Sequence, residues 1–486
     1  MLSKELADKY QLVVGLEVHA QLATSSKLFA EDAIGFGADP NTHVSVISLG
    51  HPGTLPKLNM RAVEFAVRMG LACQCTINQH SSFDRKNYFY PDLPKGYQIT
   101  QEKEPICLAG MVPILLEDGS ELEVRLNRIH LEEDAGKLIH APQKEASWVD
   151  FNRAGTALIE IVTEPCLRSS EEAVTFLNEV RKLVMYLGIC DGSMEEGSLR
   201  CDANVSVRLR GTETLGKKVE VKNMNSFRNL GRAIDYEYER QVALLEVGTA
   251  IISETRTFDA DGGCTSSMRT KEELNDYRYF PDPDLPPVLL TDKWIGSVSA
   301  NLPALPNALY RKFRETYGLP RYDAALLTES KEMALFFDAL CSKTRHYKAA
   351  SNWMMGPMKS HANETGTSFA DFPLNVEVIA QLIELVEEGQ VSFSVAAQKI
   401  YPELILNPIV TPLEIAQRLN LIQESDSSYL IPLAEEVLLE NPEKVKEFKS
   451  GKKGLLGLFM GELMKKSGGK ADPKVASRIF SELLAN

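Results

Sequence analysis

Residues 199–208, LRCDANVSVR, set the architecture of the chain, because they alternate strictly between apolar and polar side chains. A period of two is typical of a β-strand that buries one face and exposes the other. The polar face carries the Asp202 carboxylate between Arg200 and Arg208. This stretch therefore predicts a strand whose apolar side packs on a core and whose open side mixes acidic and basic groups.

Two other segments alternate in the same way. Residues 13–22, VVGLEVHAQL, place Glu17 and His19 side by side on the polar face. Residues 218–222, KVEVK, place Glu220 between two lysines. We therefore predict two further strands with ionisable side chains on one face.

If these strands share one sheet, their carboxylates and the imidazole converge on a divalent cation, while Arg200, Arg208 and Lys222 face phosphate oxygens. Carboxylates with one imidazole suit Mg²⁺ or Mn²⁺ better than zinc. Cross-strand ion pairs on a plain surface explain the same spacing equally well. The alternation thus predicts either a metal-assisted phosphoryl-transfer site or a decorated sheet face.

Three further stretches carry candidate functional residues. Glu160 interrupts the apolar run LIEIV and needs a charged or polar partner. The segment HLEEDAGK concentrates acidic groups, among them Glu133. The segment DRKNYFYPD brings Lys86 and Tyr88 into a loop that can clamp a nucleotide by charge and stacking, although a packed aromatic corner has the same composition.

The periodicity divides the 486 residues into three modules. Alternation with Gly, Pro and Asp-rich loops prevails at first, and we predict an α+β domain over residues 1–292. Apolar residues then recur every three or four positions, which predicts an all-helical middle domain over 293–407. Thr411 and Glu414 form a capping-box pattern, which opens a small helical tail over 408–486.

The tail is basic although the whole chain carries a net charge of −14. From Asn441 onward ten Lys and Arg stand against five Asp and Glu, a charge of +5, which leaves −19 for the remainder. Gly454, Gly457 and Gly461 share one helical face, a choice that costs about 1 kcal/mol each relative to Ala. We expect a close approach to that backbone, either by another helix or by RNA, whose phosphates would meet Lys452, Lys453, Lys465 and Lys466.

Several classes of protein are excluded by what the sequence lacks. No segment reaches about 18 apolar residues, and the N-terminus has no apolar leader, so we expect a cytoplasmic protein without a membrane segment. The eight cysteines show no disulfide or CxxC pattern. There is no GxxxxGK[ST] phosphate loop and no amidase nucleophile motif, so we expect any nitrogen source to lie in another chain.

Seven segments of the first module closely resemble, in the same order along the chain, segments of the family of B subunits of the aspartyl/glutamyl-tRNA(Asn/Gln) amidotransferases. They are VVGLEVHAQL, FDRKNYFYPDLPKGYQITQ, IHLEEDAGK, LIEIVTEP, MEEGSLRCDANVSVR, VEVKNMNSF and DYRYFPDPDLPP. The tail segment GKKGLLGLFMGELMKKSGGKADPKV extends the resemblance toward the C-terminus.

This resemblance implies a fold and an activity. The first module is expected to be an antiparallel-sheet cradle similar to glutamine synthetases, and the tail to resemble the YqeY proteins. Members phosphorylate the side-chain carboxylate of Glu-tRNA(Gln) or Asp-tRNA(Asn) with ATP. Ammonia that an amidase subunit releases from glutamine then displaces the phosphate, and a small third subunit holds the heterotrimer together. An aminoacyl-tRNA synthetase is a further expected partner.

The resemblance also assigns roles to residues. By motif match, metal ligands fall on Glu17, His19, Glu133, Asp202 and Glu220, with Glu160 as an addition near the same ion; four of these, Glu17, His19, Asp202 and Glu220, are also the expected catalytic residues. From their charge and position, we expect Lys86, Tyr88, Arg200 and Lys222 to face the nucleotide or the tRNA acceptor end. Some members carry a zinc-binding cysteine quartet, but residues 29–58 contain no cysteine, so we expect no structural zinc. A non-catalytic tRNA-binding scaffold is the alternative function.

Overall fold

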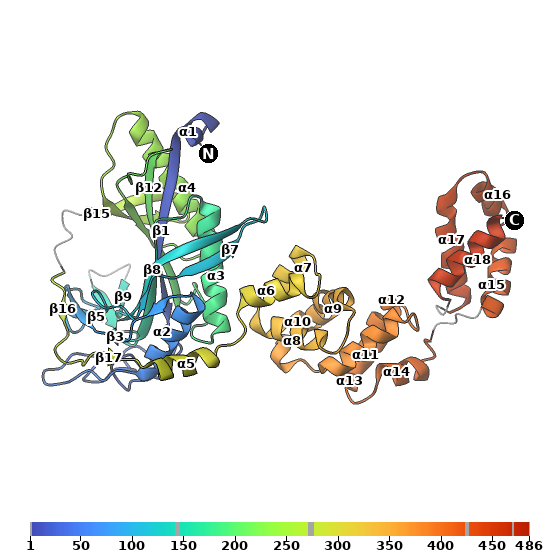
Figure 1. The fold of residues 1–486 in the computed structure, drawn as a ribbon, viewed down its shortest axis with the longest axis horizontal. Helices are drawn as coiled ribbons and strands as arrows, with labels where there is room; N and C mark the ends of the chain where they lie inside the picture. The colour runs from blue at the N-terminus through green and yellow to red at the C-terminus, as the bar shows by residue number, and fades with distance from the viewer. Residues whose placement is uncertain (1, 141–145, 271–276, 423–426, 469–470, 486) are drawn as a thin grey trace. The chain divides into compact units, whose positions relative to one another are not determined.

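The computed structural model describes residues 2–140, 146–270, 277–422, 427–468 and 471–485. The chain divides into two compact units, Met1–Pro306 and Asn307–Asn486, and each is described by itself. The first is built on a large sheet, and the second is helical throughout its described residues (Figure 1). None of the described helices is both long and apolar enough to cross a membrane.

The first unit contains a ten-stranded sheet in which nearly all neighbouring strands are antiparallel; β13 and β14 pair in parallel. In spatial order its strands are β15 (Cys264–Thr270), β14 (Glu254–Asp259), β13 (Val219–Lys222), β12 (Leu199–Leu209), β1 (Tyr10–Gln21), β11 (Ala157–Thr163), β8 (Glu121–Glu133), β6 (Cys107–Leu108) and β2 (Thr76–Ile77), with β7 (Met111–Leu115) paired to β8. The predicted mixture of helices and a mainly antiparallel sheet is confirmed.

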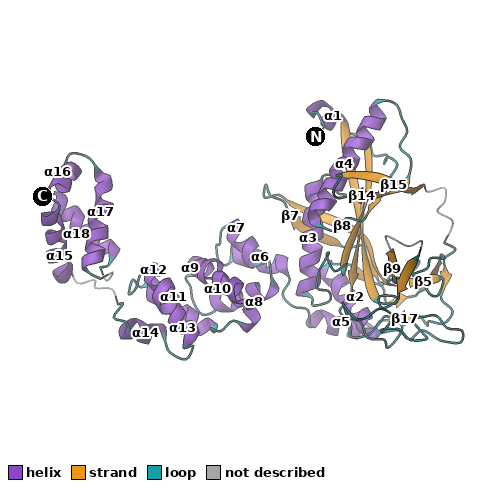
Figure 2. Ribbon diagram, turned by 180° about the vertical axis from the view of Figure 1, so that it is seen from behind, coloured by secondary structure: helices purple, strands orange, loops and turns teal. Residues whose placement is uncertain are grey.

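Helices cover one face of this sheet, as Figure 2 shows. The helices of the unit are α1 (Lys4–Lys9), α2 (Met60–Ala72), α3 (Ser170–Tyr186), α4 (Phe227–Glu246) and α5 (Asp292–Ala300). Along β1, Val14, Leu16 and Val18 are fully buried in the core that α2, α3 and α4 complete. Because side chains alternate along a strand, the polar residues of β1 point to the opposite face.

Short strands form further pieces of the first unit. They are the three-stranded sheet of β16 (Phe280–Pro281), β4 (Asp84–Asn87) and β5 (Tyr97–Thr100), the pair β9 (Lys137–His140) and β10 (Ser147–Asp150), and the pair β3 (His80–Ser81) and β17 (Val288–Leu289). Figure 2 shows β5 and β9 on the side of the long strands away from α3 and α4. These strands therefore bring loop residues toward the open face of the main sheet.

The first helices of the second unit run from α6 to α14. They are α6 (Pro306–Glu315), α7 (Arg321–Leu327), α8 (Lys331–Cys341), α9 (Tyr347–Trp353), α10 (Lys359–Thr365), α11 (Val376–Glu387), α12 (Phe393–Val395), α13 (Tyr401–Leu406) and α14 (Pro412–Arg418), with π-helical turns η2 (Met354–Met358) and η4 (Ala396–Ile400) and the 3-10 turn η3 (Phe369–Asp371). The predicted capping box at Thr411 and Glu414 is present and starts α14.

The tail helices have a hydrophobic core of their own. They are α15 (Ser427–Glu440), α16 (Pro442–Lys449), η5 (Lys453–Leu455), α17 (Leu456–Lys466) and α18 (Pro473–Ala485). Phe459, Leu463 and Phe480 are fully buried at the centre of this core. A packed apolar core explains why these short helices hold together despite their many lysines.

Two module boundaries differ from the sequence prediction. The first compact unit continues past residue 292 to Pro306, because α5 packs against α2 and contributes Val298 to the main core. Helix α14 falls in the predicted tail over 408–486 but contacts α11 and α13 instead. In both cases a helix with its own start signal packs on the preceding module, which periodicity alone does not reveal.

The close packing of α2 gives a testable prediction. A β-carbon added at Gly70 would collide with Sγ of Cys107 and lie 2.9 Å from Cδ1 of Ile77. Gly70→Ala should therefore lower the free energy of unfolding of the first unit by about 1–3 kcal/mol. Gly296→Ala in α5 is the matched control, because nothing lies within 4 Å of its added carbon. The control should instead gain up to about 1 kcal/mol from helix propensity. Chemical denaturation measures both, and equal effects would contradict the packing described.

Candidate metal and phosphate site

The pairing of β1 with its neighbours brings the predicted ionisable residues together on the open face of the sheet. Glu17 lies opposite Asp202 of β12, and His19 lies opposite Arg200. On the other side of β1, His19 lies opposite Glu160 of β11. Residues that oppose each other in an antiparallel pair point to the same face, with β-carbons about 4.5–5.5 Å apart.

Glu17, Asp202 and Glu220 form the first cluster, which we call the carboxylate trio. Each offers an oxygen within 4.8 Å of the others. The Lys222 ammonium donates to Asp202 Oδ2 at 2.5 Å and pairs with Glu220 Oε1 at 3.0 Å. Thr255 donates to the second oxygen of Glu220 at 2.8 Å. Burial, and then the charge of nearby Glu160, raises the pKa of Glu17.

His19, Glu132 and Glu160 form the second cluster, which we call the imidazole cluster. Their ligand atoms also lie within 4.8 Å of one another. His19 Nδ1 lies 3.0 Å from Glu132 Oε1. Glu160 Oε2 lies 3.2 Å from Nε2 of the buried His130, so the carboxylate in the LIEIV run has the partner that the sequence required.

The imidazole of His19 is protonated at neutral pH. Burial alone disfavours the charge, but the Glu160 and Glu132 carboxylates outweigh it and raise the pKa of His19 to about 9. The folded pKa thus exceeds the ordinary value of 6.5. Protonation therefore stabilises the fold fully below pH 6.5, and this contribution is lost as the pH rises through about 9.

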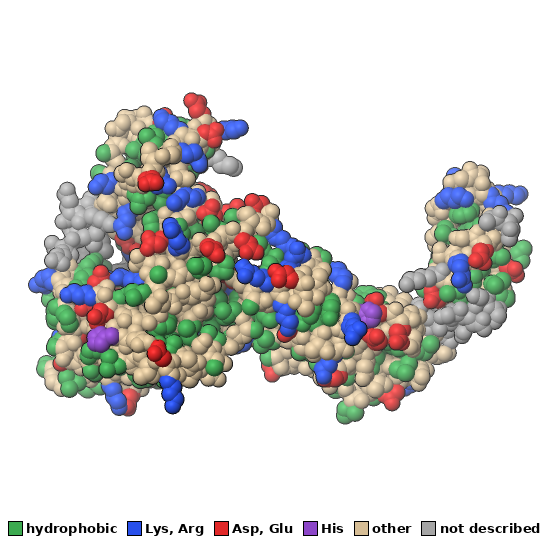
Figure 3. Space-filling model, in the orientation of Figure 1, with side chains coloured by type: hydrophobic (Ala, Val, Ile, Leu, Met, Phe, Trp, Pro, Cys, Tyr) green, Lys and Arg blue, Asp and Glu red, His purple; other side chains and the backbone are tan. Residues whose placement is uncertain are grey.

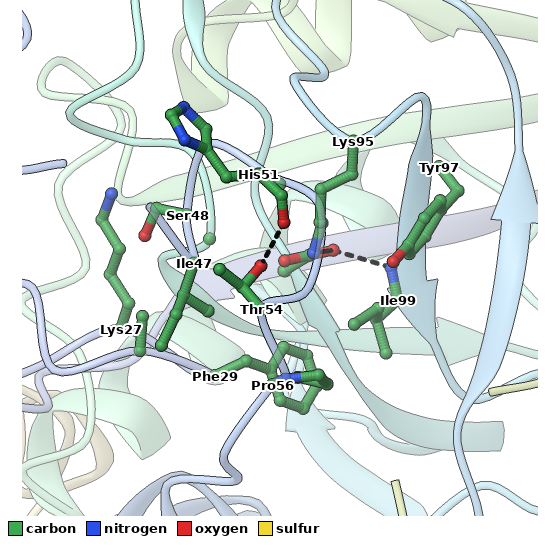
Figure 4. A pocket seen from close by; sticks show the side chains of 14 residues that line it. Lys27, Phe29, Ile47, Ser48, His51, Thr54, Pro56, Lys95, Tyr97 and Ile99 are labelled. Carbon is green, nitrogen blue, oxygen red and sulfur yellow. Dashed lines mark hydrogen bonds and ion pairs between the residues drawn. The ribbon is translucent and has the colours of Figure 1, made fainter. Parts of the chain in front are cut away.

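Glu133 lies apart from both clusters. Its carboxylate pairs with Lys95 at 2.5 Å and accepts the Ile99 N–H at 2.8 Å. It lines a separate pocket of about 110 Å³ in which Lys27 and Lys95 are also found (Figure 4). Because successive residues of β8 point to opposite faces, Glu132 reaches the open face and Glu133 does not. The carboxylate that reaches the imidazole cluster is therefore that of Glu132, the neighbour of the Glu133 that the motif match assigns.

One open cavity of about 690 Å³ connects the two clusters. All four residues predicted to face nucleotide or acceptor end, Lys86, Tyr88, Arg200 and Lys222, line this cavity. The Lys86 ammonium lies 5.0 Å from the ring centre of Tyr277 and 5.9 Å from that of Tyr88. Burial raises the pKa of the Tyr88 hydroxyl, so it stays a hydrogen-bond donor.

Five of the six predicted metal ligands thus meet, but in two clusters rather than around one ion. Glu17 and His19 are two residues apart on β1 and point to the same face, but their ligand atoms fall in different groups. Sequence reasoning missed Glu132, His130 and the buried Asp134, which accepts a hydrogen bond from Arg200 at 2.8 Å. The alternation of His130 and Glu132 against Leu131 was the available signal for β8.

The tail lysines lie in different surroundings. Lys466 pairs with Glu436 and Glu440 at 2.8 and 2.7 Å, and Lys452 pairs with Glu447 at 3.2 Å. Lys453 lies 4.4 Å from the ring centre of Phe448, and Lys465 is exposed. Figure 3 shows Lys and Arg side chains gathered over α16 on the face drawn. No described atom lies within 4 Å of a β-carbon added at Gly454, Gly457 or Gly461, so the glycine face is open.

The imidazole cluster predicts proton release on metal binding. A divalent ion needs the lone pair of a neutral imidazole, so the proton that His19 holds below pH 9 must leave. Titration with Mn²⁺ at about pH 7.5 should therefore release a proton. The affinity for Mn²⁺ should rise about tenfold per pH unit up to the pKa of His19, about 9. Calorimetry in two buffers of different ionisation heat measures the release. His19→Gln should remove it, and equal heats for the unaltered protein would contradict the assignment.

Two family models and several known proteins match this chain. Residues 12–296 match the family described as GatB/GatE catalytic domain, and residues 335–484 match the one described as GatB domain. A protein of Synechococcus sp. (strain JA-3-3Ab) is 47% identical over 481 residues, 98% of each chain. One of Nitratidesulfovibrio vulgaris (strain DP4) is 46% identical over 475 residues, 98% of this chain and 99% of that one. Both are named as the B subunit of an aspartyl/glutamyl-tRNA(Asn/Gln) amidotransferase. The resemblance found in the sequence is confirmed, and the chain belongs to the GatB/GatE family of amidotransferase B subunits.

Proposed function

We propose that this chain is the ATP-using subunit of a tRNA-dependent amidotransferase. It phosphorylates the side-chain carboxylate of Glu-tRNA(Gln), Asp-tRNA(Asn) or both, and ammonia then converts the activated residue to its amide. The observation that carries the proposal is the pair of acidic clusters with Arg200 and Lys222 in one cavity of about 690 Å³. The names of the relatives support the choice of tRNA substrate.

The donor set fits Mg²⁺ or Mn²⁺. The carboxylate trio offers only oxygen, and the imidazole cluster offers two carboxylates with one nitrogen. A divalent ion at these clusters supplies charge neutralisation for the phosphates of ATP. Burial and the charge of Glu160 raise the pKa of Glu17, and a bound cation would favour the ionised form of this carboxyl.

The cationic side chains serve the phosphoryl transfer. The substrate carboxylate oxygen attacks the γ-phosphorus, the bond to the bridging oxygen breaks, and ADP leaves with that electron pair. Negative charge on the transferring group is neutralised by Arg200, which Asp134 holds at 2.8 Å, and by Lys222. Burial opposes the charge on Lys222, but Asp202 and Glu220 raise its pKa, so the ammonium persists. Ammonia next attacks the acyl carbon, and phosphate leaves.

The partners follow from the chemistry that this chain lacks. Its sequence contains no amidase nucleophile motif, so ammonia must come from another chain. The family resemblance implies that an amidase subunit releases it from glutamine and that a small third subunit completes a cytoplasmic heterotrimer. A non-catalytic scaffold is disfavoured, because gathering carboxylates with little solvent costs stability unless a cation offsets it. Removing the charge of Asp202 therefore distinguishes a catalytic subunit from a non-catalytic scaffold.

Asp202→Asn tests the catalytic proposal. The change keeps the shape of the side chain but removes the charge that holds Lys222 and completes the carboxylate trio. ATP-dependent phosphorylation of Glu-tRNA(Gln) by the purified heterotrimer should fall by about 100-fold or more, while tRNA binding stays close to normal. Transfer of radioactive phosphate from ATP measures the first, and filter binding measures the second.

Ser206→Ala is the matched control, because Ser206 lies four residues along the same face of β12 and donates only to the Val13 carbonyl at 3.5 Å. It should leave phosphorylation within about twofold. Turnover by Asp202→Asn equal to that of the control would remove Asp202 from the site and favour the scaffold.

We further propose that the tail holds the tRNA through its exposed lysines. Lys465→Gln and Lys466→Gln are a matched pair of neighbours, since Lys466 is already neutralised by two glutamates. A lysine on a phosphate releases counterions, so Lys465→Gln should reduce the slope of log K against log salt by about 1. Lys466→Gln should change it less. Equal slopes for Lys465→Gln and the unaltered heterotrimer would exclude a phosphate contact at Lys465.

A further inference from the structure

Three arginines lie on the same face of the sheet as the cavity, farther along the strands. Arg208 lies opposite Gln11 in the continuous β1–β12 register that also pairs Glu17 with Asp202. Leu167 exchanges backbone hydrogen bonds with Val14 on the other side of β1, at 3.0 and 3.2 Å. Leu167 is buried in the core, and the charge of Arg208 acts on Arg168, so Arg168 lies near Arg208.

Arg125 completes this group from β8. Its carbonyl accepts the Glu164 N–H at 2.9 Å, and its side chain is exposed beside the buried Leu126. Burial and the charge of Arg208 lower the pKa of Arg168; the Glu172 carboxylate, which accepts the Arg168 backbone N–H at 2.6 Å, opposes them, and Arg125 lowers the pKa more weakly. We call Arg125, Arg168 and Arg208 the arginine row.

The arginine row lacks the carboxylate partners that other arginines of this unit have. Arg208 donates to the Gln11 side chain at 3.0 and 2.8 Å and to the Glu213 carbonyl at 3.1 Å. Arg168 donates to the carbonyls of Pro165 and Leu167, both at 2.9 Å. Within the described part of the chain, no carboxylate forms an ion pair with any member of the row.

Some arginines elsewhere in the first unit have carboxylate partners. Arg85 pairs with Asp282 and Asp284, both at 2.7 Å, and Arg256 pairs with Glu254 at 2.7 Å. Neutral oxygens orient the guanidinium groups of Arg168 and Arg208 but do not compensate their positive charge. Like charges held together on one face repel, and an anionic partner relieves that repulsion.

The spacing from the carboxylate trio suggests the partner. Arg208 lies six residues along β12 from Asp202, about 20 Å at 3.3 Å per residue, and Arg168 lies beside the part of β1 about 10–13 Å from Glu17. A stacked nucleic-acid strand rises about 3.4 Å per nucleotide, so these distances span about three to six nucleotides. A chain whose last residue reaches the carboxylate trio thus passes its preceding phosphates over the row.

We propose that the arginine row binds the phosphates of the tRNA acceptor arm, just before the 3′ end that enters the cavity. This inference rests on the proposed function and adds to it a docking surface on the catalytic unit, separate from the tail. Guanidinium groups suit the task, because they bind phosphate through two parallel hydrogen bonds.

The test uses the complete heterotrimer and a minihelix RNA that contains only an acceptor stem and its 3′ end. Arg168→Gln/Arg208→Gln should weaken minihelix binding about tenfold at low salt and reduce the salt slope by about 2. Arg228→Gln removes an arginine charge from an exposed position on α4, which covers the other face. This matched control should bind like the unaltered protein.

Arg168→Lys/Arg208→Lys separates charge from structure, since it keeps both charges and should keep most of the salt slope. Equal losses in the Lys and Gln variants, or unchanged minihelix binding in the Gln variant, would overturn the proposal. So would loss of subunit association on gel filtration, because the row would then face an acidic protein partner. The binding assay does not depend on catalysis. An active Asp202→Asn variant would therefore refute the proposed function, whereas minihelix binding by the Gln variant decides separately whether the arginine row binds phosphate.

Discussion

The geometry of the site rests on the pairing of β1 with β12. Their antiparallel register is unbroken from Tyr10 opposite Leu209 to Ala20 opposite Leu199. A shift by one residue would turn every side chain of one strand to the other face, exposing Val14 and Leu16 and burying the charges. The apolar core that α2, α3 and α4 complete therefore holds the carboxylate of Glu17 against that of Asp202.

Holding such groups together sets the electrostatics of the cavity. The carboxylates of the imidazole cluster keep His19 protonated, and those of the carboxylate trio keep Lys222 charged. Each acidic cluster thus carries an internal cation that competes with an incoming metal ion. The protein gains stability from these pairs, and the same pairs make metal affinity depend on pH.

Positive charge is concentrated on two surfaces outside the cavity. The tail has its own core around Phe459 and Phe480, so its exposed lysines and its open glycine face do not depend on the large sheet. Basic side chains on this module and the arginine row on the catalytic unit are two separate positive surfaces in a chain whose net charge is −14. Local charge, rather than the total, governs where a polyanion binds.

Local patterns in the sequence are enough to predict the three strands β1, β12 and β13, their polar faces, the capping box that starts α14 and the family, because alternation, capping residues and motifs act over short distances along the chain. Glu17, His19, Glu160, Asp202 and Glu220 could be singled out for the same reason. The folded chain was needed to show that two clusters form, since strand register fixes which residues oppose each other. It was also needed to show that Glu132 and not Glu133 faces the cavity, and that α5 and α14 pack on the preceding modules. These outcomes depend on contacts between residues far apart in the chain, which no local pattern records.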